Sequence, residues 1–369
     1  MASRRSILKW TGVGALGSLA AAIAGGRSAY ATNRYYAGPV SDHFDGLRFF
    51  NPCGIPPGTL RDVIKWQTSE GMVRWERPVP APPPAKPEAR VADLRVTMIG
   101  HASLLVQAGG RNVLLDPVLS PRASPLPLGD PLRFNPPGVA FEDLPPIDLV
   151  LVSHNHYDHL DTTTLRRLVE AHDPAIVTPL GNDTIIREAA PAARVTAHDW
   201  SEQTEAAGLR IALEPAHHWS ARGLNDRRKA LWAAFVVEAA GGTPAFGRIY
   251  HVGDTGYHSG INYRAAADRY DGFRLAILPI GAYAPRWFMA PQHQDPDEAL
   301  AGFLECGAEH MVPHHWGTFQ LTSEPWDEPP AKLRAAMARE DVPEWDGASG
   351  RIAVLRPGEA WDVPPRASS

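Results

Sequence analysis

Residues 150–159 carry the strongest signal in the sequence and read Val150-Leu151-Val152-Ser153-His154-Asn155-His156-Tyr157-Asp158-His159. A short apolar run followed by polar residues is typical of a buried strand that ends in a loop. This loop offers three imidazoles and one carboxylate, which are ligand types that zinc prefers. His154 and His156 are spaced to share one ion at a strand end, and Asp158 and His159 to serve a second. A surface loop that is merely rich in histidine would not explain this position directly after an apolar strand.

Three further polar groups follow predicted strands or a short apolar stretch later in the chain. They are His217 and His218, Asp254, and His314 and His315. A lone histidine beside tryptophan usually packs in the core, but three such sites, each after an apolar stretch, favour metal ligands. The carboxylate of Asp254 is suited to bridge two ions.

The motif His-x-His-x-Asp-His, with the later His, Asp and His, resembles the metallo-β-lactamase superfamily. Other segments are similar, more narrowly, to N-acyl-phosphatidylethanolamine-hydrolysing phospholipase D and its bacterial relatives. These segments are residues 38–44, 100–103, 115–117, 279–289 and 315–319. The likeness runs from about Tyr36 to Pro330.

The resemblance implies an α/β fold, the four-layer αββα sandwich, with the site at one edge. It also implies a set of ligands for two zinc ions per chain: His154, His156 and His218 on the first, Asp158, His159 and His315 on the second, and Asp254 between them. In each histidine doublet the second member is preferred, because it directly precedes tryptophan as in the family. Packing is the alternative for His217 and His314.

The expected activity is that of a phospholipase D-type phosphodiesterase acting on N-acyl-phosphatidylethanolamine-like phospholipids. Two metal ions in such a site would supply a hydroxide that could attack phosphorus, and would neutralise charge on the phosphoryl oxygens. The predicted catalytic residues are Asp158, Asp254 and His293. His293 is expected to donate to a phosphoryl oxygen or to the leaving group, and its alternative is a plain loop histidine.

Substrate contacts are predicted for Tyr157, Tyr283 and Arg286, with packing as the alternative for each. The fold and the metals do not fix the substrate. A lactonase of the L-ascorbate-6-phosphate lactonase type is therefore the alternative activity.

The first 31 residues predict a twin-arginine export signal. Arg4 and Arg5 precede an uncharged stretch at residues 10–26, and Ser-Ala-Tyr-Ala at 28–31 resembles a cleavage site. An amphipathic helix or a membrane anchor is the alternative. The prediction is export by the twin-arginine machinery to the periplasm or the medium, with at most peripheral membrane contact by the mature chain.

Composition sets the remaining limits. The 369 residues are 44% hydrophobic and carry a net charge of −5, which argues against a nucleic-acid partner. With only Cys53 and Cys306, the chain cannot form a disulfide framework, although a single disulfide between these two residues is an alternative. The chain is divided into the signal at 1–31, a wrapping segment with a proline-rich linker at 32–90, and a hydrolase domain at 91–369.

Secondary structure is predicted from apolar runs and helical spacing. Helices are expected at residues 161–171, 183–189 and 296–306, and strands at 94–99, 103–107, 112–115, 149–152, 175–178, 210–213, 232–238, 248–252 and 275–278.

Overall fold

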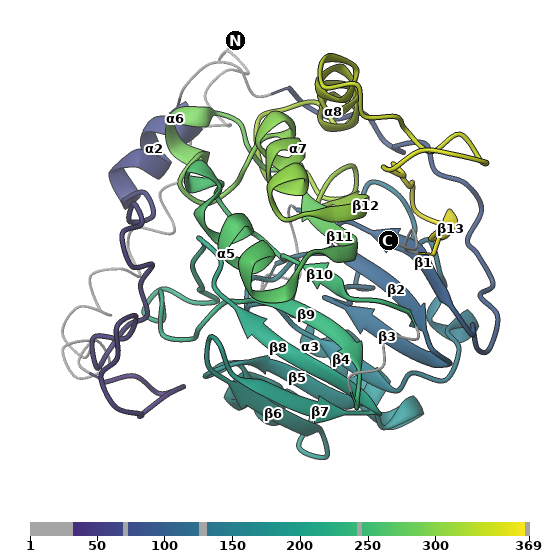
Figure 1. Ribbon diagram of the computed structural model, residues 1–369. Helices are drawn as coiled ribbons and strands as arrows, with labels where there is room; N and C mark the ends of the chain where they lie inside the picture. The colour runs from purple at the N-terminus through teal and green to yellow at the C-terminus, as the bar shows by residue number, and fades with distance from the viewer. Residues whose placement is uncertain (1–31, 69–72, 125–130, 242–245, 366–369) are drawn as a thin grey trace, which may run out of the picture.

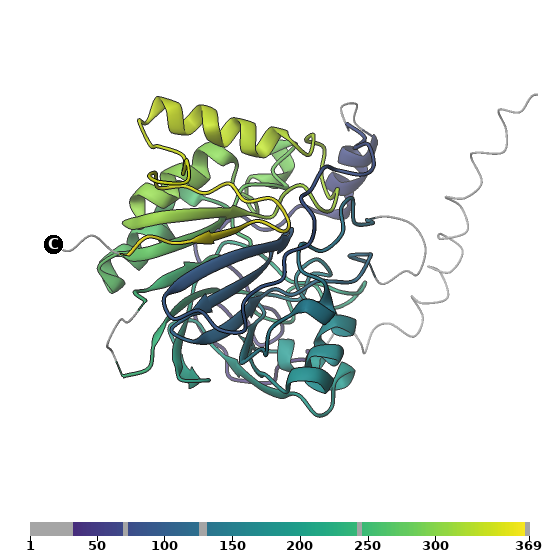
Figure 2. The same cartoon turned by 90° about the vertical axis from the view of Figure 1, so that its right-hand side faces the viewer.

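Two β-sheets pack face to face, and helices cover the outer face of each (Figures 1 and 2). This computed structural model describes residues 32–68, 73–124, 131–241 and 246–365. The predicted export signal at 1–31 lies outside the described residues. The arrangement is a four-layer αββα sandwich, so the predicted fold class is confirmed.

The first sheet has seven strands in the order β13-β1-β2-β3-β4-β5-β6. Its strands are β1 (Leu94–Gly100), β2 (Ser103–Ala108), β3 (Arg111–Leu115), β4 (Leu149–Leu151), β5 (Ala175–Pro179), β6 (Arg194–His198) and β13 (Ala360–Asp362). Strands β1 to β3 form antiparallel hairpins, and β3 to β6 run parallel. Gly109 and Gly110 turn β2 into β3 with positive φ values of 57° and 75°, a conformation that glycine adopts freely.

Helices α3 (Thr162–His172) and α4 (Asn182–Ala189) cover the outer face of this sheet. Helix α3 begins at Asp161, whose carboxylate accepts hydrogen bonds from the backbone N–H groups of Thr163 and Thr164. Such an N-cap satisfies donors that would otherwise lack a partner. The loop at 153–160 is therefore anchored at one end by β4 and at the other by the cap of α3.

The second sheet has six strands in the order β12-β11-β10-β9-β8-β7. Its strands are β7 (Gln203–Ala206), β8 (Leu209–Glu214), β9 (Ala234–Ala239), β10 (Ile249–His251), β11 (Phe273–Pro279) and β12 (Ala308–His314). Strands β10 to β12 run parallel, while β7 to β10 alternate in direction. The outer face is covered by α5 (Ile261–Tyr270), α7 (Pro296–Glu305) and α8 (Glu328–Arg339).

The main core lies between the sheets. Alternate residues of each strand point into it, as the period of two requires. Val113 and Leu149 of the first sheet meet Phe235, Ile277 and Val312 of the second, and all five are at most 2% exposed. This packing fixes the two sheets relative to each other, and with them the loops at their edge.

The N-terminal segment wraps over the sandwich. Phe44 and Phe49 are buried in one cluster with Trp232. Further along, α2 (Leu60–Thr68) lies beside α6 (Arg286–Met289), and the rings of Trp66 and Phe288 are 5.6 Å apart (Figure 1).

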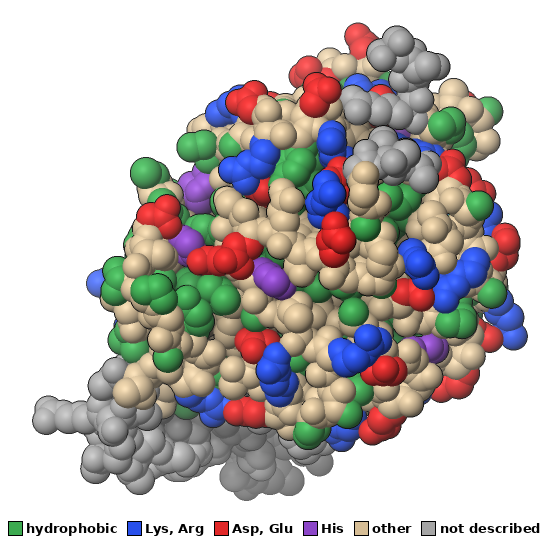
Figure 3. Space-filling model, turned by 60° about the horizontal axis from the view of Figure 1, so that its bottom comes forward, with side chains coloured by type: hydrophobic (Ala, Val, Ile, Leu, Met, Phe, Trp, Pro, Cys, Tyr) green, Lys and Arg blue, Asp and Glu red, His purple; other side chains and the backbone are tan. Residues whose placement is uncertain are grey.

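The two cysteines do not pair. Cys53 is exposed, Cys306 is buried, and both are free thiols. Across the described ranges, no helix combines the length and apolarity that a bilayer span requires. On the face drawn in Figure 3, acidic and basic side chains are interspersed.

Candidate metal centre

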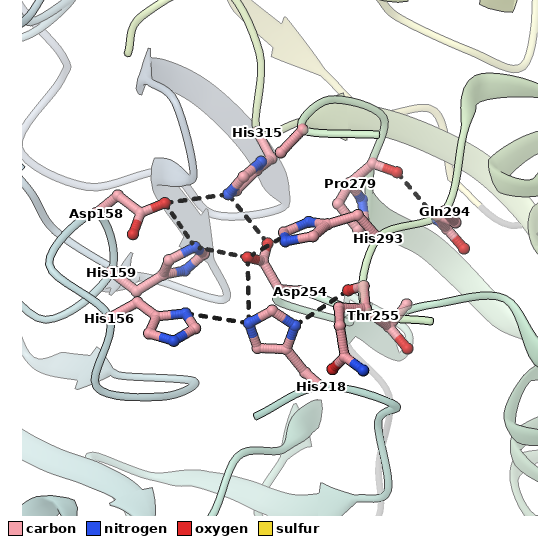
Figure 4. Close-up of polar contacts among 12 residues, drawn as sticks. His156, Asp158, His159, His218, Asp254, Thr255, Pro279, His293, Gln294 and His315 are labelled. Atoms are coloured by element: carbon pink, nitrogen blue, oxygen red, sulfur yellow. Dashed lines mark hydrogen bonds and ion pairs between the residues drawn. The ribbon is translucent and has the colours of Figure 1, made fainter. Parts of the chain in front are cut away.

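The predicted ligands follow strands that end at the same edge of the sandwich. The loop after β4 carries His154 to His159, and the segments after β8, β10 and β12 carry His218, Asp254 and His315. Figure 4 shows the side chains of His159, His218 and His315 turned toward Asp254. The structure brings all seven predicted ligands together in two main groups: His154, His156 and His218 with Asp254, and Asp158, His159 and His315 with His101. A third, smaller group joins Asp254 and His315 to His293.

The first group has the spacing of ligands on one ion. Nδ1 of His156 lies 2.9 Å from Nε2 of His154 and 3.2 Å from Nε2 of His218. Oδ2 of Asp254 lies 3.6 Å from Nε2 of His218 and 3.9 Å from that of His154. Tetrahedral ligands about 2.0–2.1 Å from a zinc ion are about 3.3 Å from one another. The four side chains therefore fit one such ion.

Hydrogen bonds behind two of these rings fix where their protons lie. Nδ1 of His218 is 3.0 Å from the carbonyl oxygen of Gln292, so Nδ1 donates and Nε2 keeps its lone pair. Ser153 Oγ donates to Asp116 Oδ2 at 2.6 Å and therefore accepts from Nδ1 of His154 at 3.0 Å. The lone pairs of His154 and His218 consequently face the same point. A metal ion at that point would accept both lone pairs.

The second group surrounds a second point on the other side of Asp254. Nε2 of His315 lies 3.2 Å from Asp158 Oδ2 and 3.2 Å from Asp254 Oδ1. Nε2 of His159 lies 3.3 Å from Asp254 Oδ2 and 3.5 Å from Asp158 Oδ2. Asp254 contacts ligands of both groups, which is the bridging position predicted for it.

Protonation favours metal binding in the first group. Burial lowers the pKa of His154 and of His218 well below the ordinary value, so both rings are neutral and have a free lone pair. Burial alone would raise the pKa of Asp254, but the nearby His315 and His159 lower it well below its usual range. The Asp254 carboxylate is therefore charged, as a metal ligand must be.

Asp116 orients His159. It directly follows β3, and its Oδ2 accepts from Nδ1 of His159 at 2.7 Å. Its Oδ1 accepts from the backbone N–H of Ser153 at 2.7 Å. This carboxylate–histidine pair leaves Nε2 of His159 directed at the metal position. In the sequence, Asp116 stood out only as part of the family resemblance. Its position directly after a predicted strand could also have indicated a role in the site.

His101 contacts two ligands of the second group. It lies in the turn between β1 and β2, and its Nε2 is 2.9 Å from Asp158 Oδ2. Its carbonyl oxygen accepts the backbone N–H of His315 at 2.9 Å. Burial lowers the pKa of His101 to about 3, so the neutral ring donates from Nε2 to the carboxylate. His101, too, was quoted in the sequence only as part of the resemblance.

A cavity of about 260 Å³ opens onto these groups. His156, Asp158, Asp254 and the predicted catalytic His293 line its inner end. Nδ1 of His293 is 3.9 Å from Asp254 Oδ2 and has no hydrogen-bond partner. The other walls are mainly apolar and include Val63, Trp66, Trp219, Phe288, Met289 and Leu321.

The three predicted substrate residues have partners elsewhere. The hydroxyl of Tyr157 donates to the carbonyl of Arg222, and that of Tyr283 donates to Glu328. Arg286 forms ion pairs with Asp295 and Glu298 and also binds the carbonyl of His293. None of the three is among the described residues that line the metal cavity. Their substrate contacts stay a prediction.

The first members of the histidine doublets turn away from the metal groups. Nδ1 of His217 accepts from Asn262, and its ring stacks on His258 at 3.9 Å. His314 is fully buried beside His251, with their ring centroids 5.3 Å apart. Within the described chain, neither His217 nor His314 belongs to a ligand group.

The sequence profile described as "Beta-lactamase superfamily domain" matches residues 111–316. The chain belongs to this superfamily. A solved metallo-β-lactamase fold protein of Bacillus subtilis superposes with a TM-score of 0.50 at 17% identity, over 73% of this chain and 99% of that one. The sandwich is therefore the metallo-β-lactamase fold.

Two relatives are similar over most of the chain. An uncharacterized protein of Mycobacterium tuberculosis is 36% identical over 77% of this chain and 73% of its own length. N-acyl-phosphatidylethanolamine-hydrolyzing phospholipase D 1 of Caenorhabditis elegans is 35% identical over 74% of this chain and 77% of its own. Other relatives are named metal-dependent hydrolases. The chain is a metal-dependent hydrolase of the superfamily, with histidine and aspartate groups able to bind metal.

We expect the zinc-loaded chain to bind two ions. His218→Ala should lose about one of them, because His154, His156 and His218 converge on one metal position and the variant removes one of these three ligands. His217→Ala is the matched control and should keep both, since its ring faces His258. Elemental analysis after dialysis measures both variants. Equal zinc content in His218→Ala and the wild type would contradict the ligand assignment.

Proposed function

We propose that this hydrolase is a zinc-dependent phosphodiesterase of phospholipase D type that cleaves N-acyl-phosphatidylethanolamine-like phospholipids. The observation that carries the proposal is the cavity itself. It joins two ligand groups, both in contact with Asp254, to walls built from Trp66, Phe288 and Met289. The 35% identity to the Caenorhabditis elegans phospholipase D supports the same substrate class.

The cavity suits an amphiphilic ester. An anionic phosphodiester fits its inner end, where the metal ligands and His293 converge. Acyl chains fit the apolar walls between α2 and α6, where their burial contributes about 0.8 kcal/mol per methylene. A small polar substrate would leave these walls without contacts.

When bound, the two zinc ions would neutralise charge on the phosphoryl oxygens and lower the pKa of water toward 7. The chain's residues supply the geometry. Asp116 holds the ring of His159, and His101 holds the carboxylate of Asp158. Asp254 links the two positions.

His293 is placed to donate a hydrogen bond to the substrate. It lines the cavity, and its backbone N–H and carbonyl are tied to Met289 and Arg286. Burial lowers the pKa of His293 to about 4, so the neutral ring predominates at pH 7 and carries one N–H. A neutral N–H is a good donor to a phosphoryl oxygen but a weak proton source for a leaving group.

The zinc-loaded chain should hydrolyse N-acyl-phosphatidylethanolamine to phosphatidic acid and N-acylethanolamine. Mass spectrometry of the products tests this, with phosphatidylethanolamine, phosphatidylcholine and a panel of lactones run alongside. Removal of zinc by a chelator should abolish the activity, and added zinc should restore it. Faster cleavage of lactones than of any phosphodiester would replace this proposal with the lactonase activity.

We expect His293→Ala to keep its zinc and to lose activity by roughly 10²–10³-fold, the cost of one oxyanion donor. The loss should be similar for a nitrophenyl and an alkyl phosphodiester, because the donor serves the phosphoryl oxygen in both. Steady-state rates and zinc content measured together decide the matter. A loss confined to the alkyl ester would show that His293 assists the leaving group instead.

We also propose export through the twin-arginine pathway, on the strength of Arg4, Arg5 and the short uncharged stretch behind them. Replacing both arginines by lysine should keep the protein in the cytoplasm. Cell fractionation with an antibody tests this. Unchanged appearance of the double variant outside the inner membrane would contradict the proposal.

A further inference from the structure

Arg227 brings a cation into the metal cavity. It lines the same cavity as His156 and Asp254. Its guanidinium carbon lies 4.5 Å from the centroid of the Trp219 ring, and that ring packs against His156 with a centroid distance of 4.7 Å. The guanidinium is thus one aromatic ring removed from the first group of metal ligands. Neither the seven predicted ligands nor His293 gives Arg227 a function in the site.

Among the described residues, the charge of Arg227 has no anionic partner. Its Nη2 donates to the carbonyl oxygen of Gly58 at 2.6 Å, and its buried Nε has no hydrogen-bond partner. In the part of the chain that the structure describes, Arg227 forms no ion pair. Its charged neighbours are Arg228 and Arg48, which add positive potential. Arg286, by contrast, is neutralised by two carboxylates.

Such a cation gains from a substrate anion. Partial burial removes water from the guanidinium, and an unpaired charge there costs free energy. The guanidinium has N–H groups besides the one bonded to Gly58, and such charged donors bind the oxygens of a carboxylate or phosphate. Under the proposed function, the phosphodiester would bind beyond the Trp219 ring, among the candidate metal ligands. The guanidinium, which lines the same cavity, would therefore meet a different part of the same molecule.

We infer that Arg227 selects phosphodiesters that carry a second negatively charged oxygen group, on the substituent extending from the metal ligands past Trp219 toward Gly58. This inference rests on the proposed phosphodiesterase function and narrows its substrate class. The preferred substrate has an apolar part for the α2 and α6 walls and a terminal anion for Arg227. A neutral N-acyl chain satisfies only the first requirement.

A matched pair of lipids tests the selection. Dihexanoyl phosphatidylethanolamine is N-linked either to a pentanoyl group or to a glutaryl group, which differ by a terminal methyl or carboxylate. For the zinc-loaded wild type, kcat/KM should favour the glutaryl lipid about five- to tenfold, the size expected of one partly solvated charged contact. Arg227→Gln should abolish this preference, and Arg227→Lys should retain part of it.

Arg228→Gln is the control for general electrostatics. Arg228 is the adjacent cation, but it is not among the residues that line the cavity. This variant should keep the wild-type preference. A preference lost equally in Arg227→Gln and Arg228→Gln would show that net charge, and not a contact of Arg227, attracts the anion.

A binding measurement separates this inference from the proposed function. Phosphonate analogues of both lipids, with CH₂ in place of the scissile oxygen, are titrated calorimetrically into the zinc-loaded wild type and Arg227→Gln. Tighter binding of the glutaryl analogue by the wild type alone supports the role of Arg227, even if neither ester is hydrolysed. Failure to hydrolyse either ester contradicts the phosphodiesterase. Equal affinity of the wild type for both analogues would overturn the inference. So would an equal loss of affinity for both analogues in Arg227→Gln. In either case Arg227 would only support the segment at Gly58.

Discussion

The site depends on one electrostatic constraint, which is the convergence of lone pairs and carboxylates on two points beside Asp254. The Asp254 carboxylate is 3% exposed and lies between two sets of imidazoles. Partners behind the rings fix the protons of His154, His159 and His218 on the far nitrogen. The near nitrogens of His154 and His218 therefore face one point, and the near nitrogen of His159 faces Asp254 and Asp158, so that bound cations would be stabilised at both positions. The fold holds this arrangement because the strands before the ligands end at one edge of a rigid, close-packed sandwich.

Much of the fold was predictable from the sequence because its central strands are continuous apolar runs. The nine predicted strands and three predicted helices all form, with ends within two residues of those observed. Strands β6 and β7 were missed because they are short and polar, with Gln203 and Glu205 exposed at a sheet edge. Strand β12 was missed because His310, Pro313 and His314 interrupt its apolar pattern, although all lie in or against the core.

The metal ligands were predictable because they follow strand ends and, in the first motif, lie within six residues. The supporting contacts were harder to find, because His101 and Asp116 are single polar residues without a local pattern. The cavity walls could not be predicted, since α2 and α6 come from segments more than two hundred residues apart and meet only in the folded chain. Arg286 forms ion pairs with Asp295 and Glu298, and its substrate contact stays a prediction.

The central claim is that two metal ions lie on either side of Asp254, each held by its own three side chains. Anomalous diffraction at the zinc edge, from crystals of the zinc-loaded chain, tests it most directly. The account predicts two peaks, one among His154, His156 and His218 and one among Asp158, His159 and His315, with Asp254 in contact with both. A single peak, or peaks that do not adjoin Asp254, would contradict it.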